Sequence, residues 1–491
     1  MKRIERKPYK CEIKMARLFY KIMKPVIQRR AFSFLREKNL QRKIDQLIAM
    51  KMKMLANCTI GQKMGATASS KLADLPFTGY NYYLPYFKEP HEGDFIYPVK
   101  DYVKAITSGT MGKPKTYLLP RTGLEHNVQN TAASIFFFAT HNGEKPTFEV
   151  GDTIYTNMPA GNYLSGHIEK NIKKDSSDFV NLVPPNPDGM TFDEKVQYFV
   201  DHYKEIDVAY MTITTLLDEI YPAVGEEFKL KGLFTQDTAA GPMREKIKKV
   251  IGCYPSTIYG STETMFCGLP SIEHNGGFFL DWRITVPEFV AEKDTVSTDI
   301  VLLEEHPDTI GFMDVEVGKR YQLVATPIRN DMTRYVMPDI LEVIAKGDNV
   351  LNTDQPVFKY YSRSDKLIVL HNFTRINEEE LLQVLSETEI PFIDFTTRKE
   401  REDTHEYMHM YIELSREVPK EEVYKKIHEH LIEFDKDYHD LVTLLKYDPL
   451  KVTLLPRGAF QRYLRSREGI PRISRIGMRE DRFKELMTHS S

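Results

Sequence analysis

Short apolar runs alternate with helical patterns through the first half of the chain. The runs DTIYTNM (152–158), DVAYMTI (207–213) and LKGLFTQ (230–236) each have the length of one strand, and helical spacing covers 123–139 and 193–205. Strands that alternate with helices predict βαβ units around a parallel or mixed sheet. This alternation constrains the fold most strongly, because it indicates an α/β domain.

The pattern changes twice after this region. A β-rich block comes first, made of GGFFLDWRI, TDIVLLEE, YQLVATPI and ILEVIA. After YYSRSDKLIVL (360–370) the order becomes strand, helix (NEEELLQVLSE), strand (HMYIEL), helix (KEEVYKKIHEHLIEF) and strand (KVTLLP), followed by a basic tail. With 491 residues the chain is too long for one core. We predict a helical segment over 1–54, a large α/β domain with mixed sheets over 55–362, and a smaller α+β domain over 363–491.

Charge is distributed unevenly. The whole chain has a net charge of -3, which argues against nucleic-acid binding through overall charge. Residues 1–54 nevertheless carry 17 Lys/Arg against 4 Asp/Glu on a helical pattern. This segment lacks the apolar core of a signal peptide, and no apolar run approaches the ~20 residues of a membrane span. It is either a solvated basic helix face or a weak contact for an anionic partner or membrane surface.

The four cysteines, Cys11, Cys58, Cys253 and Cys267, form no CxxC pair. This usage predicts a reducing, cytoplasmic location without a structural zinc site.

A glycine-rich stretch, ITSGTMGKPK (106–115), lies between two predicted strands. Glycines permit unusual backbone conformations, and the hydroxyls, exposed amides and lysines together suit a phosphate group. The stretch is not a Walker loop, because two residues separate its glycines and Pro114 follows Lys113. A tight turn without a ligand is the alternative interpretation.

A second loop, YGSTE (259–263), follows a predicted strand. It offers an aromatic face, a glycine, hydroxyls and one carboxylate, and a carboxylate beside phosphates suits Mg²⁺. An ordinary turn with a surface glutamate remains the alternative.

Four ordered segments together resemble the acyl-adenylate-forming superfamily of acyl-CoA synthetases, luciferases and adenylation domains. They are TSGTMGKPK (107–115), YGSTE (259–263), RYVMPD (334–339) and SRSD (362–365). The chain is most similar to the auxin-conjugating acyl-amido synthetases and their bacterial relatives, on LPFTGYNYYLPYF, VEVGKRYQLVATP, VFKYYSRSDKLIVLHNFTRINEEEL and IPRIS. Phenylacetate-CoA-ligase-like enzymes come second. The resemblance covers roughly residues 40–480.

The resemblance assigns roles to individual residues. Those expected to hold ATP or AMP are Thr107, Ser108, Gly109, Thr110, Gly112, Thr238, Ala239, Ala240, Tyr259, Gly260, Ser261 and Asp339. Those expected to act in catalysis are Lys115, Thr262, Glu263 and Arg363, with Glu263 also the Mg²⁺ ligand. Tyr259 is expected to stack near the base, Asp339 to bind the ribose, and Asp365 to be the hinge of a mobile small domain.

The implied reaction has two steps. A small carboxylic acid reacts with ATP to give acyl-AMP and pyrophosphate, and the acyl group then passes to an amine. Transfer to the thiol of CoA is the alternative, and a non-catalytic adenylate-binding sensor is an alternative of another class. The resemblance includes no nucleic-acid partner.

Three positions depart from the family pattern. Met111 replaces a hydroxyl residue of the phosphate loop, and Pro338 replaces a glycine before Asp339. The tail lysine that the family uses for adenylation aligns with Gly469. Arg467, Arg472 or Arg475 could supply the positive charge instead, because charge stabilisation requires a cation and not a titratable amine.

Overall fold

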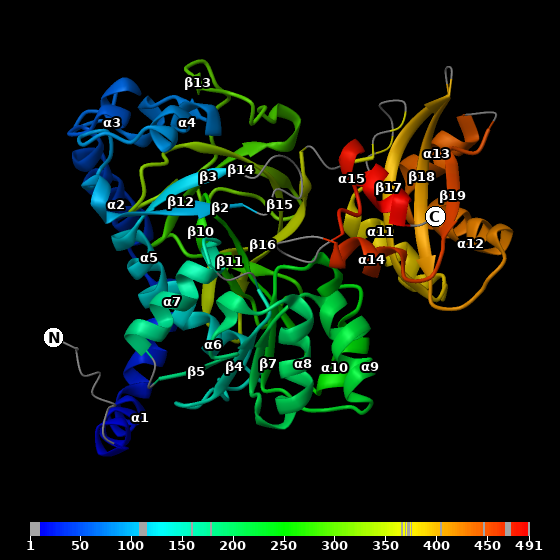
Figure 1. Cartoon of the computed structure of the whole chain (residues 1–491). Helices are drawn as coiled ribbons and strands as arrows, with labels where there is room; N and C mark the ends of the chain where they lie inside the picture. The colour runs from blue at the N-terminus through cyan, green and yellow to red at the C-terminus, as the bar shows by residue number, and fades with distance from the viewer. Residues whose placement is uncertain are drawn as a thin grey trace.

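The computed structural model describes residues 10–107, 115–158, 161–176, 179–364, 367–368, 370, 374, 376–402, 405–444, 447–466 and 473–489. It has a large amino-terminal part with mixed sheets and a smaller α+β unit at the right of Figure 1. The α/β fold class predicted from the sequence is therefore confirmed.

The predicted alternation forms a parallel sheet in the lower part of Figure 1. Its strands run in the order β5 (Asn181–Val183), β4 (Thr153–Thr156), β6 (Val208–Tyr210), β7 (Gly232–Thr235) and β8 (Pro255–Thr257). The connecting helices are α7 (Leu164–Ser176), α8 (Phe192–His202), α9 (Tyr221–Val224) and α10 (Arg244–Ile251). Strands β6 and β7 are buried throughout, as expected where helices cover both faces. The carboxyl ends of all these strands lie at one edge, where ligands bind in open α/β sheets.

A larger, mainly antiparallel sheet adjoins that edge. Its order is β12 (Thr285–Ala291), β14 (Arg320–Pro327), β15 (Tyr335–Asp348), β16 (Thr353–Arg363), β11 (Phe278–Leu280), β10 (Met265–Pro270) and β9 (Tyr259–Ser261). The short strands β1 (Phe77–Thr78) and β13 (Leu302–Leu303) pair with each other, and β1 also pairs with β15. The register places Asp339 of β15 opposite Arg363 of β16. The predicted β-rich block is thus a single sheet.

The helices of the amino-terminal region share one hydrophobic core with this sheet. They are α1 (Lys10–Ser33), α2 (Leu40–Leu55), α3 (Thr59–Lys63), α4 (Tyr80–Lys88), α5 (Arg121–Asn127) and α6 (Ala133–Ala139), with a π-helical turn at Val128–Ala132 between the last two. The prolines and tyrosines of 75–90 predict a loop with short extended pieces. The extended piece is present as β1, but a helix replaces the loop. Helix α4 forms there because Tyr82, Tyr83, Tyr86 and Phe87 bury one face against the core.

The smaller unit contains a sheet in the order β17 (Phe392–Glu402), β18 (His405–Leu414) and β19 (Leu450–Leu455). Its helices are α11 (Glu378–Glu387), α12 (Lys420–Phe434), α13 (Lys436–Leu444), α14 (Ala459–Arg465) and α15 (Glu480–His489). The sequence pattern missed β17, α13 and the two helices within the predicted tail. The predicted boundary near Arg363 lies where β16 ends, and Asp365 lies outside the described residues.

A buried lysine fixes the loop that leads into β15. The ammonium of Lys51, on α2, donates to the carbonyl oxygens of Pro327 at 2.6 Å, Asn330 at 2.9 Å and Met332 at 2.5 Å. Lys51 is fully buried. These bonds tie the amino-terminal helices to the segment that precedes Asp339.

Replacing Lys51 with methionine should lower the free energy of unfolding by about 3 kcal/mol or more, because each of three buried carbonyl oxygens left without a donor costs about 1–3 kcal/mol. Thermal unfolding of the full chain measures the change. Lys53→Met is the control, since Lys53 lies on the same helix and is exposed. Equal unfolding temperatures for the two variants would contradict the assigned role of Lys51.

Candidate active site

A two-stranded hairpin flanks the glycine-rich stretch. Strands β2 (Tyr102–Ile106) and β3 (Thr116–Pro120) pair antiparallel up to Ile106 and Thr116. The amide of Thr107 donates to the carbonyl of Lys115, and the amide of Lys115 donates to the hydroxyl of Thr107, each at 3.0 Å. The two predicted strands are therefore present, and these two bonds join their ends. Residues 108–114, including Ser108, Gly109, Thr110, Met111 and Gly112, lie outside the described residues.

Lys115 lies over an aromatic ring at the base of the loop. Its Nζ is 4.7 Å from the centroid of the Tyr80 ring, a cation–π distance. The hydroxyl of Tyr80 donates to the carbonyl of Thr116 at 3.0 Å. Helix α4, which the sequence pattern did not predict, therefore orients the candidate phosphate-binding lysine.

A hydrogen bond joins the two candidate loops. Two residues after Lys115, the hydroxyl of Tyr117 donates to Oε1 of Glu263 at 2.6 Å. Burial, and then the charge of Glu263, raise the pKa of Tyr117 well above its usual value, so the hydroxyl keeps its proton. The strand that leaves the glycine loop thus fixes the carboxylate of YGSTE.

The donor set suits a magnesium ion that arrives with a nucleotide. No cluster of three His, Cys, Asp or Glu side chains able to hold a metal exists among the described residues. Mg²⁺ commonly binds through one or two carboxylates together with substrate phosphates, and it retains several waters. Glu263, held beside the glycine loop, fits that pattern.

The YGSTE turn is held largely by its own side chains. The hydroxyl of Ser261 accepts from the amides of Glu263 at 3.2 Å and Thr264 at 3.1 Å, so it shapes the turn. Thr262 is buried. A Cβ on Gly260 would lie 2.7 Å from the carbonyl oxygen of Met265, which explains why this position is glycine. Ser261 therefore has a structural use beside the nucleotide contact expected of it.

Tyr259 and Asp339 contact each other directly. The hydroxyl of Tyr259 donates to Oδ2 of Asp339 at 2.6 Å, and its ring stacks on Phe278 with a centroid distance of 5.2 Å. One face of the Tyr259 ring is therefore occupied by Phe278. The register places Asp339 opposite Arg363. The backbone carbonyl of Pro338 accepts from the amide of Ser364 at 2.7 Å, which ties β15 to the end of β16 at this corner.

The segment 238–240 forms a 3₁₀ turn at the carboxyl end of β7. The carboxylate of Asp237 accepts from the amides of Ala239 and Ile213, each at 3.0 Å, and both alanines are buried. Nothing is described of the Thr238 side chain. The turn lies at the sheet edge where the other loops meet.

Gln236 is a site residue that the sequence analysis missed. Its amide donates to the carbonyl of Gly260 at 2.6 Å and accepts from the hydroxyl of Tyr210 at 2.9 Å. It thereby joins the ends of β6 and β7 to the YGSTE loop. A polar residue directly after the apolar run LKGLFT was the available signal.

Arg475 is the one candidate for the missing tail cation that lies within the described residues. Its guanidinium is 2.7 Å from Asp394, 3.3 Å from Glu378 and 3.7 Å from Asp237. Although burial opposes the charge, these carboxylates hold the pKa of Arg475 above its usual value. The first two acids belong to the small unit and Asp237 belongs to the parallel sheet, so Arg475 bridges the two parts. Gly469, Arg467 and Arg472 lie outside the described residues.

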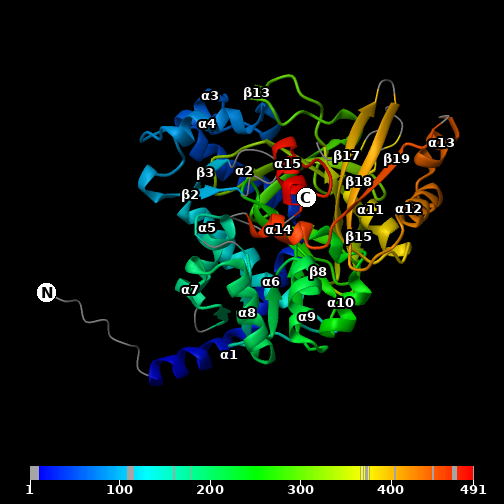
Figure 2. The same cartoon turned by 45° about the vertical axis from the view of Figure 1, so that its right-hand side comes forward.

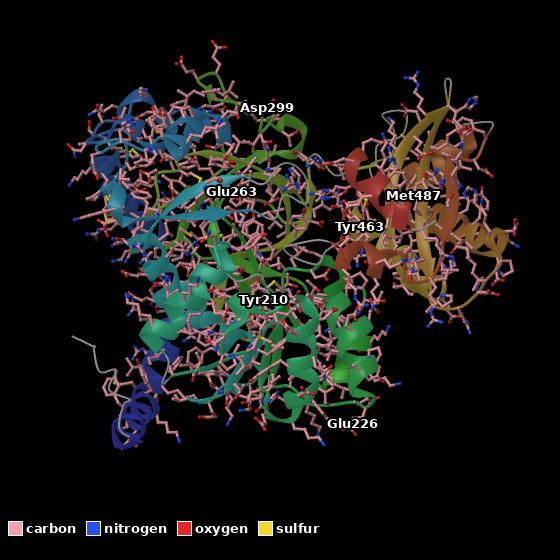
Figure 3. The ribbon with its side chains drawn as sticks, in the orientation of Figure 1. Tyr210, Glu226, Glu263, Asp299, Tyr463 and Met487 are labelled. Carbon is pink, nitrogen blue, oxygen red and sulfur yellow. The ribbon has the colours of Figure 1, made fainter. Side chains whose placement is uncertain are left out.

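An apolar cavity of about 60 Å³ lies beside the YGSTE loop. Its wall includes Phe136 of α6, Ile168 of α7, Tyr210 of β6, Phe234 of β7, Phe266 of β10 and Ile258, which precedes β9. Tyr210 and Phe234 stack at 4.8 Å, and Phe266 lies opposite Gly260 in the β9–β10 register. The cavity therefore lies next to the YGSTE loop. Figure 3 shows Tyr210 and Glu263 in the middle of the large part.

Comparison with solved structures identifies the fold. No protein-family model matches the sequence, and no curated protein matches it. The chain is similar to AtGH3.15 acyl acid amido synthetase in complex with 2,4-DB, with a TM-score of 0.69, 13% identity, and coverage of 99% of this chain and 98% of that one. It is similar to 2-hydroxyisobutyryl-CoA ligase in the postadenylation state with 2-HIB-AMP, with a TM-score of 0.62, 14% identity and coverage of 94% and 93%.

These are acyl-adenylate-forming ligases, so the fold is the one that the sequence resemblance implied. The same CoA ligase in complex with 2-HIB-AMP and CoA, in the thioesterification state, gives a lower TM-score of 0.51, with 16% identity and coverage of 87% and 88%.

Proposed function

We propose that this protein is an ATP- and Mg²⁺-dependent ligase that activates a small carboxylic acid as acyl-AMP, releases pyrophosphate and passes the acyl group to an amine. The Tyr117–Glu263 hydrogen bond carries this proposal, because it places the candidate metal carboxylate beside the strand that leaves the glycine loop. Transfer to CoA is the second candidate, supported by the likeness to a CoA ligase over 94% of the chain.

In this proposal the loops stabilise the charge that gathers when the acid's carboxylate attacks the α-phosphorus. Lys115 and the amides of the glycine loop bind the phosphates, and Thr262 contacts the α-phosphate. Asp339 accepts hydrogen bonds from the ribose hydroxyls, and these replace the bond that Tyr259 donates to it. Arg363 lies opposite Asp339 in the strand register. A bound Mg²⁺ held by Glu263 would neutralise phosphate charge.

The small unit has a separate role in the proposal. It rotates about the segment that follows Arg363, near Asp365, between adenylation and acyl transfer.

The apolar cavity accommodates the acid's hydrocarbon part. At about 60 Å³ it is smaller than the engineered cavity of about 150 Å³ that holds benzene. We therefore expect short aliphatic acids to be better substrates than aromatic ones.

Carboxylate-dependent exchange of labelled pyrophosphate into ATP tests the proposal. It is run on the full chain with a panel of aliphatic and aromatic acids. Exchange with any acid supports adenylation, and a preference for short aliphatic acids supports the cavity assignment. ATP binding without exchange would replace the proposal with the sensor alternative. Adding amino acids or CoA to an active pair, with mass analysis of the product, distinguishes the two acceptors.

A further inference from the structure

Helix α1 exposes a row of apolar side chains. Leu18, Phe19, Ile22 and Val26 are 59%, 57%, 67% and 57% exposed. At 3.6 residues per turn they cover an arc of about 100° on one side of the helix. The other large apolar side chains that are exposed among the described residues are dispersed singly, at Tyr254, Val301, Val317, Val350 and Phe434. A contiguous apolar row of this kind marks an interaction surface.

The opposite side of α1 attaches the helix to the body of the protein. The ring of Tyr20 lies 5.5 Å from that of Phe179, and Lys24 forms an ion pair with Glu149 at 2.7 Å. Near the carboxyl end, Phe32 packs on Phe138 with a centroid distance of 4.5 Å. The core therefore holds one side and leaves the row from Leu18 to Val26 free. Figures 1 and 2 both show α1 extending away from the sheets.

Basic residues accompany the apolar row. Lys21, Arg29 and Arg30 are exposed on the same helix. Residues 1–54 have a net charge of +13 (17 minus 4), and the rest of the chain, with 50 Lys/Arg and 66 Asp/Glu, has -16. The cationic region is thus concentrated at one end of an otherwise acidic protein. This uneven charge turns the basic end of the protein toward a negatively charged surface.

We propose that α1 docks on an anionic lipid surface, with Leu18, Phe19, Ile22 and Val26 entering the boundary between headgroups and acyl chains and the lysines and arginines on the headgroups. Binding of this kind combines burial of apolar side chains with the attraction of neighbouring Lys and Arg to anionic lipids. A nucleic acid would satisfy the charges and leave the apolar row exposed to water. Among the described residues, no helix is long and apolar enough to cross the bilayer, so α1 would lie along its surface.

Vesicle flotation of the full chain tests this proposal. Vesicles of phosphatidylcholine alone are compared with vesicles containing about a third phosphatidylserine, at low and high salt. We expect partitioning onto the anionic vesicles to be at least about tenfold stronger, and to fall as salt screens the headgroups. In the L18S/F19S/I22S variant it should drop at least about tenfold, since the buried apolar area is lost.

The V301S/V317S variant is the matched control, because it removes exposed apolar side chains elsewhere and should bind vesicles normally. Circular dichroism checks that all variants fold alike. Failure to bind anionic vesicles, or undiminished binding of the triple variant, would overturn the proposal. A lipid-free dimer that the triple variant abolishes would also overturn it, by assigning the row to a second copy of the chain.

Discussion

Exchanging Glu263 for glutamine should lower carboxylate-dependent pyrophosphate–ATP exchange by about 10²–10³-fold, the range seen when one group that stabilises transition-state charge is removed. Glutamine has the same shape, and its amide oxygen can still accept from Tyr117. The variant therefore removes the charge that would hold Mg²⁺ and leaves the loop in place. The exchange rate at saturating ATP, measured across a magnesium titration, gives the effect.

Glu316→Gln is the matched control, because Glu316 is exposed and pairs only at the surface with Lys319 at 3.0 Å. It should exchange like the native chain. If the Glu263→Gln variant exchanges at the native rate, Glu263 is not the metal ligand. A substitution of Lys115 would then test the rest of the proposed function.

Replacing Arg475 with methionine should lower the free energy of unfolding by about 3–5 kcal/mol, because removing one partner of a buried ion cluster leaves uncompensated charges. The carboxylates left behind are Asp394, Glu378 and Asp237, and Asp394 is 2% exposed. Thermal unfolding measures the stability. Because Arg475 spans the two parts of the chain, small-angle scattering should also show a larger radius of gyration.

Arg479→Met provides the comparison, since Arg479 pairs with Asp481 near the surface. An exposed pair of this kind contributes at most about 1 kcal/mol. If Arg475→Met unfolds at the same temperature as Arg479→Met and keeps a compact shape, Arg475 does not hold the two parts together.

The alternation of strands and helices around the parallel sheet could be anticipated because its evidence is local. DTIYTNM, DVAYMTI and LKGLFTQ are apolar runs of strand length, and helical spacing covers 123–139 and 193–205. Helix α4 could not be anticipated, because Pro85 and the tyrosines favour a loop until the core buries them. Strand β17 ends in a run of charged residues, RKERE, and forms by pairing with β18. In both cases tertiary packing overrides the local preference.

The candidate site likewise has residues that the sequence reveals and contacts that only the fold reveals. The motif residues at 107–115 and 259–263 were visible in the sequence, and the contact between Tyr117 and Glu263 was not, because it joins segments that are far apart in the chain. The same reason applies to Gln236 and to the carboxylates around Arg475. Sequence patterns indicate which residues carry chemistry, and the fold decides which of them meet.

The apolar cavity and the candidate nucleotide site beside it are built from different residues. Side chains of α6, α7, β4, β5, β6, β7 and β10 line the cavity, and the described residues expected to bind the nucleotide lie outside that lining. In the proposed function, one set selects the acid and the other carries out nucleotide chemistry. Substitutions in the wall can therefore change which acid is accepted without altering activation, so the fold can acquire new substrates, in evolution or by engineering, through a few core residues.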